Sequence, residues 1–169
     1  DIFARHNGYA YKMIGDAFQV AFAAARDALN AAIEAQRELS KGEAFANTLP
    51  LQSPQIRVRM VLHTGVTEER GDDYVGPVLN RVQRLLSAGH GGQVLLSNAT
   101  EELVRDRLPA NTSLRDLGEH RLKDLIRPEK IFQIVAADLP SEFPPLNARH
   151  APEQFASATD LVHRPRKRN

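Results

Sequence analysis

The chain has 169 residues, of which 42% are hydrophobic and 25% are charged, and this composition is typical of one globular domain with a sizeable core. It contains no cysteine, which excludes a disulfide scaffold, a cysteine-ligated zinc site and a cysteine nucleophile. The formal net charge is +1, so nucleic-acid binding through overall charge is not expected, and no apolar run has the length of a membrane span.

The first third of the chain predicts a hairpin, a helix and a loop. Two short apolar runs in residues 9–22 flank Gly15-Asp16, and glycine supplies the positive φ angle that a tight hairpin turn needs. Residues 23–41 are rich in Ala, Leu, Glu and Arg, and their apolar positions have helical spacing. Residues 43–55, which contain two prolines, predict a surface loop.

The rest of the patterned sequence alternates strands with helices. Residues 56–63 alternate apolar and polar side chains and predict the clearest strand, and residues 64–74 predict a polar connection. Gly76-Pro77 opens a helix that ends before Gly89. The remaining expected elements are a strand at 93–97, a helix from 98 to about 107, and strands at 114–122 and 129–136. This interleaving predicts the α+β class, with helices packed on a mostly antiparallel sheet.

Several polar side chains within these elements suit the chemistry of a nucleotide. Asp16 at a hairpin tip is a hard oxygen ligand for Mg²⁺. Asn80 and Arg84 lie four residues apart, so they share one helix face, and an amide with a guanidinium suits negative charge that develops on a phosphate. Lys123 adds another positive charge. Taken singly, these residues are more simply explained as a plain turn (Asp16), a solvated helix face (Asn80 and Arg84) and a charged surface stretch (Lys123).

Lys12 and Asp73 form a second candidate pair. Lys12 donates hydrogen bonds, and the Asp73 carboxylate accepts them. Such a pair matches a purine edge with one acceptor beside an amino donor, which is the edge of adenine. By itself, Asp73 is also consistent with a loop residue or a helix-entry residue that has no ligand.

Three segments together resemble the catalytic domain of the class III nucleotidyl cyclases, the adenylate and guanylate cyclase family. The family patterns are K-x-x-G-D, then D-[YFI]-x-G-x-x-x-N-x-x-x-R, then a lysine near the last strands. This chain has KMIGD at 12–16, DYVGPVLNRVQR at 73–84 and RLKDL at 121–125. The resemblance covers about residues 1–146 and implies the ferredoxin-like nucleotidyl cyclase fold.

The resemblance implies a role for each matching residue in forming 3′,5′-cyclic AMP and pyrophosphate from ATP. Lys12 and Asp73 would recognise the base, as the adenine-type pair. Asn80 and Arg84 would stabilise the transition state as the ribose 3′-oxygen attacks the α-phosphate. Lys123 would bind the terminal phosphates.

The metal site is where this chain departs from the family pattern. The resemblance assigns Asp16 to one of two aspartates that bind Mg²⁺ or Mn²⁺. The other lies in an F-x-D-I-x-G-[ST] segment on an opening strand, whereas this chain begins with DIFARHNG, which is similar to the end of the helix that follows that strand. We therefore expect the first strand, the first metal ligand and the phosphate-binding turn to be missing, and we expect little or no cyclase activity from the chain itself.

The resemblance also implies partners. In this family the active site lies between two subunits, which implies a homodimer. Similar bacterial domains precede an ATPase or transcriptional-regulator region, which implies such a region downstream, a role in intracellular signal transduction and a cytoplasmic location. A second hypothesis is a non-catalytic domain that binds nucleotide, or dimerises, to control that region. An RNA-binding domain is the weakest hypothesis, because the chain has no Trp and its body is nearly neutral.

The composition changes toward the end of the chain. Five of the ten prolines lie between residues 140 and 165, which predicts a cyclase domain at 1–139 and a proline-rich linker with a disordered tail at 140–169. Codons written for residues 153–168 and read one base later encode a sequence similar to the linker that enters an ATPase domain. We therefore hypothesise a frameshift after Pro152.

Overall fold

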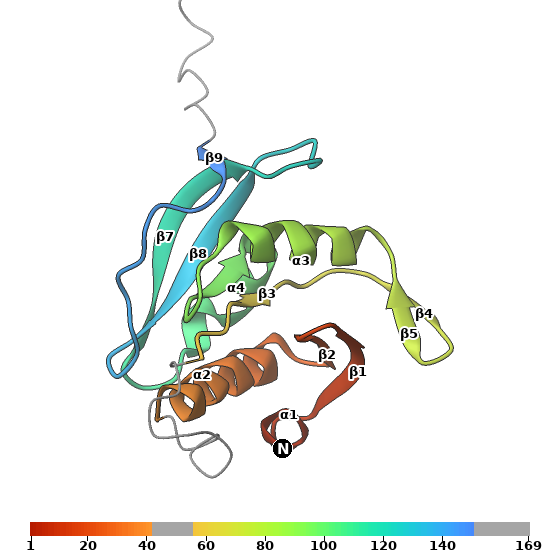
Figure 1. The fold of residues 1–169 in the computed structure, drawn as a ribbon, viewed down its shortest axis with the longest axis horizontal. Helices are drawn as coiled ribbons and strands as arrows, with labels where there is room; N and C mark the ends of the chain where they lie inside the picture. The colour runs from red at the N-terminus through yellow and green to blue at the C-terminus, as the bar shows by residue number, and fades with distance from the viewer. Residues whose placement is uncertain (42–55, 151–169) are drawn as a thin grey trace, which may run out of the picture.

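The computed structural model describes residues 1–41 and 56–150, and Figure 1 shows how their helices and strands are arranged. The helices are α1 (Ile2–Arg5), α2 (Ala25–Lys41), α3 (Pro77–Ala88), α4 (Asn98–Val104) and the 3-10 helix η2 (Arg105–Arg107). The strands are β1 (Gly8–Ile14), β2 (Ala17–Phe22), β3 (Met60–Leu62), β4 (Glu68–Arg70), β5 (Asp73–Val75), β6 (Val94–Ser97), β7 (Thr112–Arg121), β8 (Glu129–Ala136) and β9 (Arg149–His150).

The central sheet has five strands in the order β3-β6-β8-β7-β9. Strands β3 and β6 are parallel, and the other neighbouring pairs are antiparallel. The predicted α+β class with a mostly antiparallel sheet is therefore confirmed. The β1–β2 and β4–β5 hairpins form separate two-stranded sheets within the described residues.

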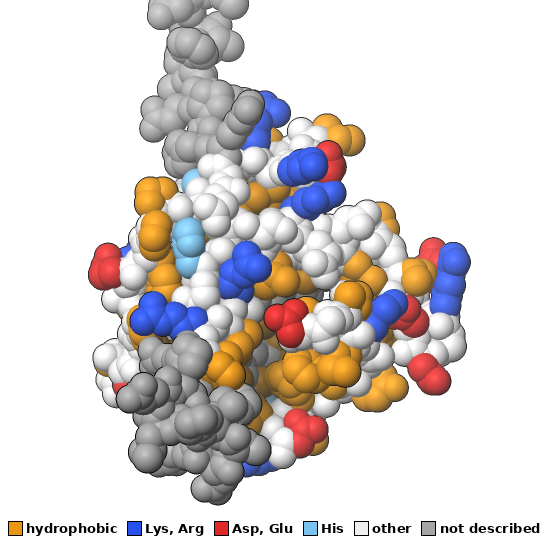
Figure 2. All heavy atoms as spheres, viewed as in Figure 1, with side chains coloured by type: hydrophobic (Ala, Val, Ile, Leu, Met, Phe, Trp, Pro, Cys, Tyr) orange, Lys and Arg blue, Asp and Glu red, His pale blue; other side chains and the backbone are white. Residues whose placement is uncertain are grey.

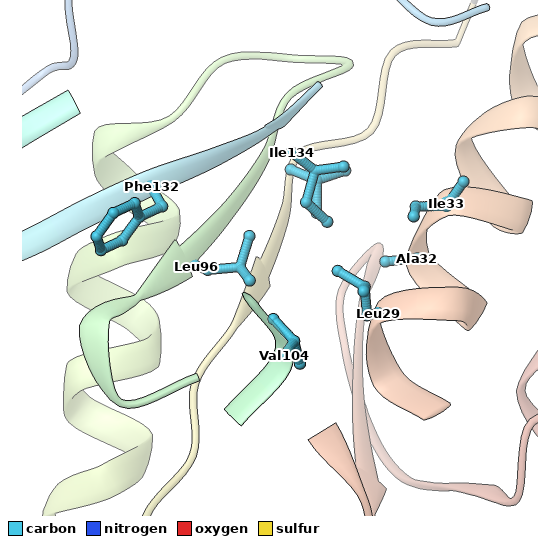
Figure 3. Close-up of a cluster of buried hydrophobic side chains, with 8 residues drawn as sticks. Leu29, Ala32, Ile33, Leu96, Val104, Phe132 and Ile134 are labelled. Atoms are coloured by element: carbon cyan, nitrogen blue, oxygen red, sulfur yellow. The ribbon is translucent and has the colours of Figure 1, made fainter. Parts of the chain in front are cut away.

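The core lies on both faces of the central sheet, because successive side chains of a strand point to opposite faces. On one face, Leu96 and Ile134 pack against Leu29 of α2 and Val104 of α4, as Figure 3 shows. On the other face, Leu95 of β6 packs with side chains of α3 and β8. The sheet is thus covered by α2 and α4 on one side and by α3 on the other.

The α3 helix has one buried and one polar side. Leu85 and Ala88 are buried against the sheet, whereas Asn80 is exposed. Pro77 occupies the first helical turn, where its fixed φ angle suits the helix and its missing N–H costs no hydrogen bond. The predicted start and end of this helix are confirmed, and its polar side is presented at a defined place on the core.

The predicted strand at 56–63 is much shorter in the structure. Only Met60–Leu62 pairs with a neighbour, which is the four-residue strand β6. The preceding residues run beside the sheet, where the Val58 carbonyl accepts hydrogen bonds from the Gly92 N–H (2.9 Å) and the Gln36 amide (2.7 Å). The alternation of apolar and polar side chains correctly predicted a strand in this segment. Its length, however, is limited by the neighbouring strand that can pair with it.

The predicted polar connection at 64–74 contains a second hairpin. Strands β4 and β5 pair antiparallel, and Gly71 in the turn between them has a φ angle of 61°. Gly71-Asp72 has the same dipeptide and the same two-residue loop as Gly15-Asp16. This repeated Gly-Asp turn was therefore present in the sequence, but only three residues on each side form the ladder.

Part of the segment from residue 138 onward lies against the sheet. The Ser141 carbonyl accepts from Gln133 of β8 (2.8 Å) and from Arg115 of β7 (3.0 Å), and the Asn147 N–H donates to the Ala88 carbonyl (2.9 Å). Proline-rich composition disfavours regular structure, but it does not prevent such irregular packing. The domain division after residue 139 stays a prediction, as does the missing first strand, and the hypothesised frameshift after Pro152 lies outside the described residues.

Every helix in the described part of the chain is too short or too polar to cross a membrane.

We expect Leu29→Ala to lower the free energy of unfolding by about 2–5 kcal/mol, because it leaves a cavity between α2 and the sheet where the side chain is 0% exposed. Leu103→Ala on α4, where the side chain is 59% exposed, is the control and should cost about 0.5 kcal/mol or less. Urea unfolding of both variants measures the difference. Equal losses in the two variants would contradict this assignment of the core.

Candidate functional site

The β1–β2 hairpin carries two of the predicted site residues. Gly15 has a φ angle of 61° in a two-residue turn with Asp16, and this positive angle is one that glycine adopts readily. The Asp16 carboxylate is exposed at the tip. Lys12 precedes the turn on β1 and lies opposite Gln19 of β2. The predicted hairpin is confirmed, and it presents a carboxylate at its tip and an ammonium group on its strand.

Lys12 and Asp73 are brought together although they are 61 residues apart in the sequence. The Lys12 ammonium contacts one carboxylate oxygen of Asp73, and the other oxygen accepts from the Tyr74 N–H (2.9 Å). The hydrogen bond from Lys12 is the main cause that holds the pKa of Asp73 below its usual value. Both side chains stay partly exposed, so the ion pair is accessible to a ligand.

Two aromatic residues lie beside this ion pair. The Tyr11 and Tyr74 rings meet edge to face, with centroids 4.8 Å apart, and the Tyr11 hydroxyl donates to the Gln19 side chain (3.0 Å). Burial raises the pKa of the Tyr11 hydroxyl, and the negative charge of Asp73 raises it further. Tyr11 sits at a shift in the β1–β2 register, and such irregularities re-aim side chains. The aromatic contact joins the two hairpins at the place where Lys12 meets Asp73.

The polar side of α3 follows directly after β5. Asn80 is exposed, and Arg84 lies one helical turn later with its guanidinium against the Asp124 carboxylate. Within residues 1–41 and 56–150, neither Asp16 nor Asn80 makes a side-chain hydrogen bond or an ion pair. The sequence therefore placed Asn80 and Arg84 on one face correctly, but of these two only Arg84 has a side-chain partner among the residues that the structure describes.

Lys123 and Asp124 are the central residues of a tight turn between β7 and β8. The Leu125 N–H donates to the carbonyl of Leu122 (3.2 Å), and the Leu122 residue is buried. Asp124 has a φ angle of 61°, a left-handed conformation that Asp tolerates better than most residues. The Lys123 ammonium is exposed and has no ion pair among the described residues. Through the Arg84–Asp124 contact, the turn that carries Lys123 is held next to α3.

The described side chains do not by themselves make a divalent metal site. Within the parts of the chain that the structure describes, no group of three or more His, Asp or Glu side chains is placed to hold a metal ion. Mg²⁺ and Mn²⁺ require several hard oxygen ligands, and Asp16 supplies one exposed carboxylate. Asp16 fits one ligand position of such a site and no more.

His63 directly follows strand β3 and stays neutral at pH 7. Its Nδ1 atom is 2.7 Å from the Ser97 hydroxyl. Burial, followed by the positive charge of Arg81, lowers the pKa of His63 from 6.5 to about 4. The imidazole is therefore a structural hydrogen-bonding group at neutral pH and adds no charge to the site.

The chain has relatives among curated proteins, although no protein-family model matches it. An uncharacterised protein of Mycobacterium bovis is 43% identical over 145 residues, which cover 85% of this chain and 46% of that protein. An uncharacterised protein of Mycobacterium tuberculosis is 34% identical over 145 residues, which cover 82% of this chain and 52% of that protein. The chain thus spans about half the length of these relatives. The adenylate cyclase of Schizosaccharomyces pombe is 29% identical, covering 78% of this chain but 10% of that enzyme.

Solved structures with the same fold are nucleotidyl cyclases. An adenylate/guanylate cyclase/hydrolase from Silicibacter pomeroyi superposes with a TM-score of 0.65 at 23% identity, over 80% of this chain and 77% of that one. The adenylyl cyclase CyaB from P. aeruginosa has a TM-score of 0.61 at 24% identity, over 82% and 78% of the two chains. The guanylyl cyclase Cya2 has a TM-score of 0.59 at 21% identity, over 86% and 77%.

The chain has the fold of the class III adenylate/guanylate cyclase domain, and the predicted family resemblance is confirmed at this level. Its distant sequence relatives include proteins named adenylate cyclase, so it is a cyclase-like domain. The assigned roles of Lys12, Asp73, Asn80, Arg84 and Lys123 stay predictions.

Sequence reasoning missed three residues at this site. Tyr11 and Tyr74 are adjacent in sequence to Lys12 and Asp73, and an aromatic residue beside each member of a predicted pair was the available signal. Asp124 is adjacent to Lys123, but its contact with Arg84 spans 40 residues and had no local signal.

We expect the imidazole of His63 to titrate near pH 4 in the folded protein. Because its pKa in the unfolded chain is 6.5, the unfolded state takes up the proton first as the pH falls. The stability that neutral His63 contributes is therefore complete above pH 6.5 and is lost as the pH falls toward about 4. NMR titration measures the pKa directly, and a midpoint at or above 6.5 would contradict the buried environment.

In urea unfolding, His63→Gln is the matched variant, because glutamine keeps a hydrogen-bonding group for Ser97 but does not titrate. The drop in stability between about pH 7 and about pH 5 should be smaller in this variant than in the unaltered chain.

Proposed function

We propose that this chain is the nucleotide-binding part of a class III adenylate cyclase domain, whose complete form makes 3′,5′-cyclic AMP and pyrophosphate from ATP. The observation that carries the proposal is the contact between Lys12 and Asp73. The two residues that the family pattern assigns to adenine recognition come from two different hairpins, yet their functional groups touch and stay partly exposed.

Adenine would bind between the two charged groups. The Lys12 ammonium would donate to the ring nitrogen that accepts, and the Asp73 carboxylate would accept from the exocyclic amino group. Guanine presents a donor and an acceptor in the opposite order on this edge, so the same pair would disfavour it. The hydrogen bond that the Tyr74 N–H donates to Asp73 supports this role, because it limits the orientation of the carboxylate.

The phosphates would lie along the polar side of α3. Arg84 and Asn80 would stabilise the charge that develops as the ribose 3′-oxygen bonds to the α-phosphorus and the bond to pyrophosphate breaks. Lys123 would bind the terminal phosphates as a point charge. The proximity of the Lys123 turn to Arg84, through Asp124, supports a shared phosphate site.

The complete enzyme would use Mg²⁺ or Mn²⁺, with Asp16 as one ligand. Two such ions supply activation of the attacking oxygen and neutralisation of the leaving group. Because Asp16 is one exposed carboxylate with no acidic cluster around it in the described residues, we propose that the 169-residue chain alone has little or no cyclase activity.

A homodimer is part of the proposal. Four large apolar side chains of the β1–β2 hairpin are each more than half exposed, namely Tyr9, Met13, Ile14 and Phe18. An exposed apolar group of this size is typical of a surface that a partner covers. We further propose a cytoplasmic signalling protein in which an ATPase or regulator region follows this domain.

The alternative is a non-catalytic domain that binds nucleotide, or only dimerises, and so controls the rest of the protein. It is favoured by the finding that no group of three or more His, Asp or Glu side chains in the described ranges is placed to hold a metal ion. One measurement distinguishes the two functions. A longer form of the protein, supplied with ATP and Mn²⁺, makes cyclic AMP if the domain is a cyclase and makes none if the domain is non-catalytic.

Incubating the chain with ATP and Mn²⁺ should yield little or no cyclic AMP, while isothermal titration should detect ATP binding with a preference over GTP. Lys12→Met and Asp73→Ala should each reduce that preference, because each removes one of the two groups that read the base. Arg37→Gln, which breaks the exposed Arg37–Asp138 pair elsewhere, is the control and should leave the preference unchanged. Abundant cyclic AMP from the chain alone would contradict the proposed inactivity.

In a longer form of the protein that makes cyclic AMP, we expect Asn80→Ala and Arg84→Gln to lower kcat by about 10²-fold or more. Nucleotide affinity should change much less, because these groups act mainly on charge that appears in the transition state. Gln83→Ala, an exposed position on the same helix, is the control. A large rise in KM with unchanged kcat would reassign both residues to ground-state binding.

A further inference from the structure

The α3 helix carries two arginines whose carboxylate partners differ in burial. Arg81 pairs with Glu129 of β8, whose side chain is 7% exposed, and Arg84 pairs with Asp124, whose side chain is 59% exposed. The two arginine side chains themselves are alike, at 38% and 37% exposed. The difference between the pairs therefore lies in the acid.

This difference in burial decides which arginine can exchange its carboxylate partner for another anion. A buried carboxylate such as Glu129 is costly to leave without its Arg81 partner, so that pair is retained. An exposed carboxylate such as Asp124 is hydrated by water as soon as it separates from its arginine. Exposed ion pairs are therefore weak, and another anion readily replaces the carboxylate. Of the two arginines, Arg84 is the one that an incoming anion can capture.

The position of Asp124 in its turn places two opposite charges side by side. Lys123 and Asp124 are the central residues of the turn closed by Leu122 and Leu125, and this turn lies above α3 in the view of Figure 1. Figure 2 shows basic and acidic side chains gathered over the same connection. The turn thus offers one cation to a phosphate while its neighbouring carboxylate neutralises the second cation, Arg84.

We propose that Asp124 is a counter-ion that competes with the polyphosphate of a nucleotide for Arg84, and so sets the affinity of the site for polyphosphate anions. The inference rests on the proposed function, in which the phosphates lie along the polar side of α3 next to Arg84 and Lys123 binds the terminal ones. Without ligand, the carboxylate occupies Arg84. When a polyphosphate binds, its oxygens replace the carboxylate on the guanidinium, and Asp124 turns to water while still repelling the bound anion.

Asp124 is a positioning residue in this scheme, because it acts through Arg84. Asp124→Asn is the sharpest test, since asparagine keeps the size of the side chain and its tolerance of a left-handed φ angle but removes the charge. We expect ATP and inorganic tripolyphosphate each to bind the variant about 5-fold more tightly or better at low salt, by isothermal titration, and the gain to shrink as salt is added.

Two controls separate this effect from a structural one. Asp124→Glu restores the charge and should return both affinities toward those of the unaltered chain. Glu142→Gln removes the carboxylate from the exposed Arg115–Glu142 pair and should leave both affinities unchanged. Thermal unfolding should be similar in Asp124→Asn, Glu142→Gln and the unaltered chain, because each of the two substitutions alters an exposed pair.

The arginine provides the decisive comparison. In an Arg84→Gln background, Asp124→Asn should change tripolyphosphate affinity by less than about 2-fold, because the competitor has lost the group it competes for. The inference is overturned if Asp124→Asn gives no gain, if the same gain persists without Arg84, or if no variant binds tripolyphosphate. If the unaltered chain shows no preference for ATP over GTP, the proposed base recognition is contradicted instead, and the base-free tripolyphosphate still decides the role of Asp124.

Discussion

The geometry of the site depends on the contact between Lys12 and Asp73, because it joins two hairpins that neither share a sheet with each other nor belong to the central sheet. Isolated two-stranded hairpins are marginal in water, so their relative position must come from contacts between them. The ion pair and the edge-to-face contact of Tyr11 with Tyr74 supply those contacts. Since β5 continues through Gly76 into α3, the same contacts relate the β1–β2 hairpin to the polar side of that helix.

The charges of the site are largely balanced within the chain. Lys12 has Asp73 as its partner and Arg84 has Asp124, whereas Lys123 has no ion pair among the described residues. Binding of a nucleotide, as we propose it, is therefore an exchange in which base and phosphate groups replace carboxylates. Exposed pairs permit such an exchange at small cost, whereas the pair of Arg81 with the buried carboxylate of Glu129 does not.

The central sheet acts as the platform for these groups. Leu85 and Ala88 anchor one side of α3 in the core, which leaves Asn80 and Arg84 on the accessible side of the same helix. Leu122 is buried at the start of the turn that carries Lys123, so a residue of the core also places this cation. The proposed phosphate ligands are thus held by packing, while their functional groups remain in contact with water.

Local patterns in the sequence were enough to predict the hairpin around Gly15, the α3 helix and the β8 strand, because turn chemistry and hydrophobic period act over a few residues. The family pattern also identified Lys12 and Asp73 as a pair. The strand at 56–63 was predicted too long, since alternation carries no information about the length of the neighbour that must pair with it. Only the tertiary structure revealed the contact of Tyr11 with Tyr74 and that of Arg84 with Asp124, because each joins residues tens of positions apart whose approach is decided by the packing of separate elements.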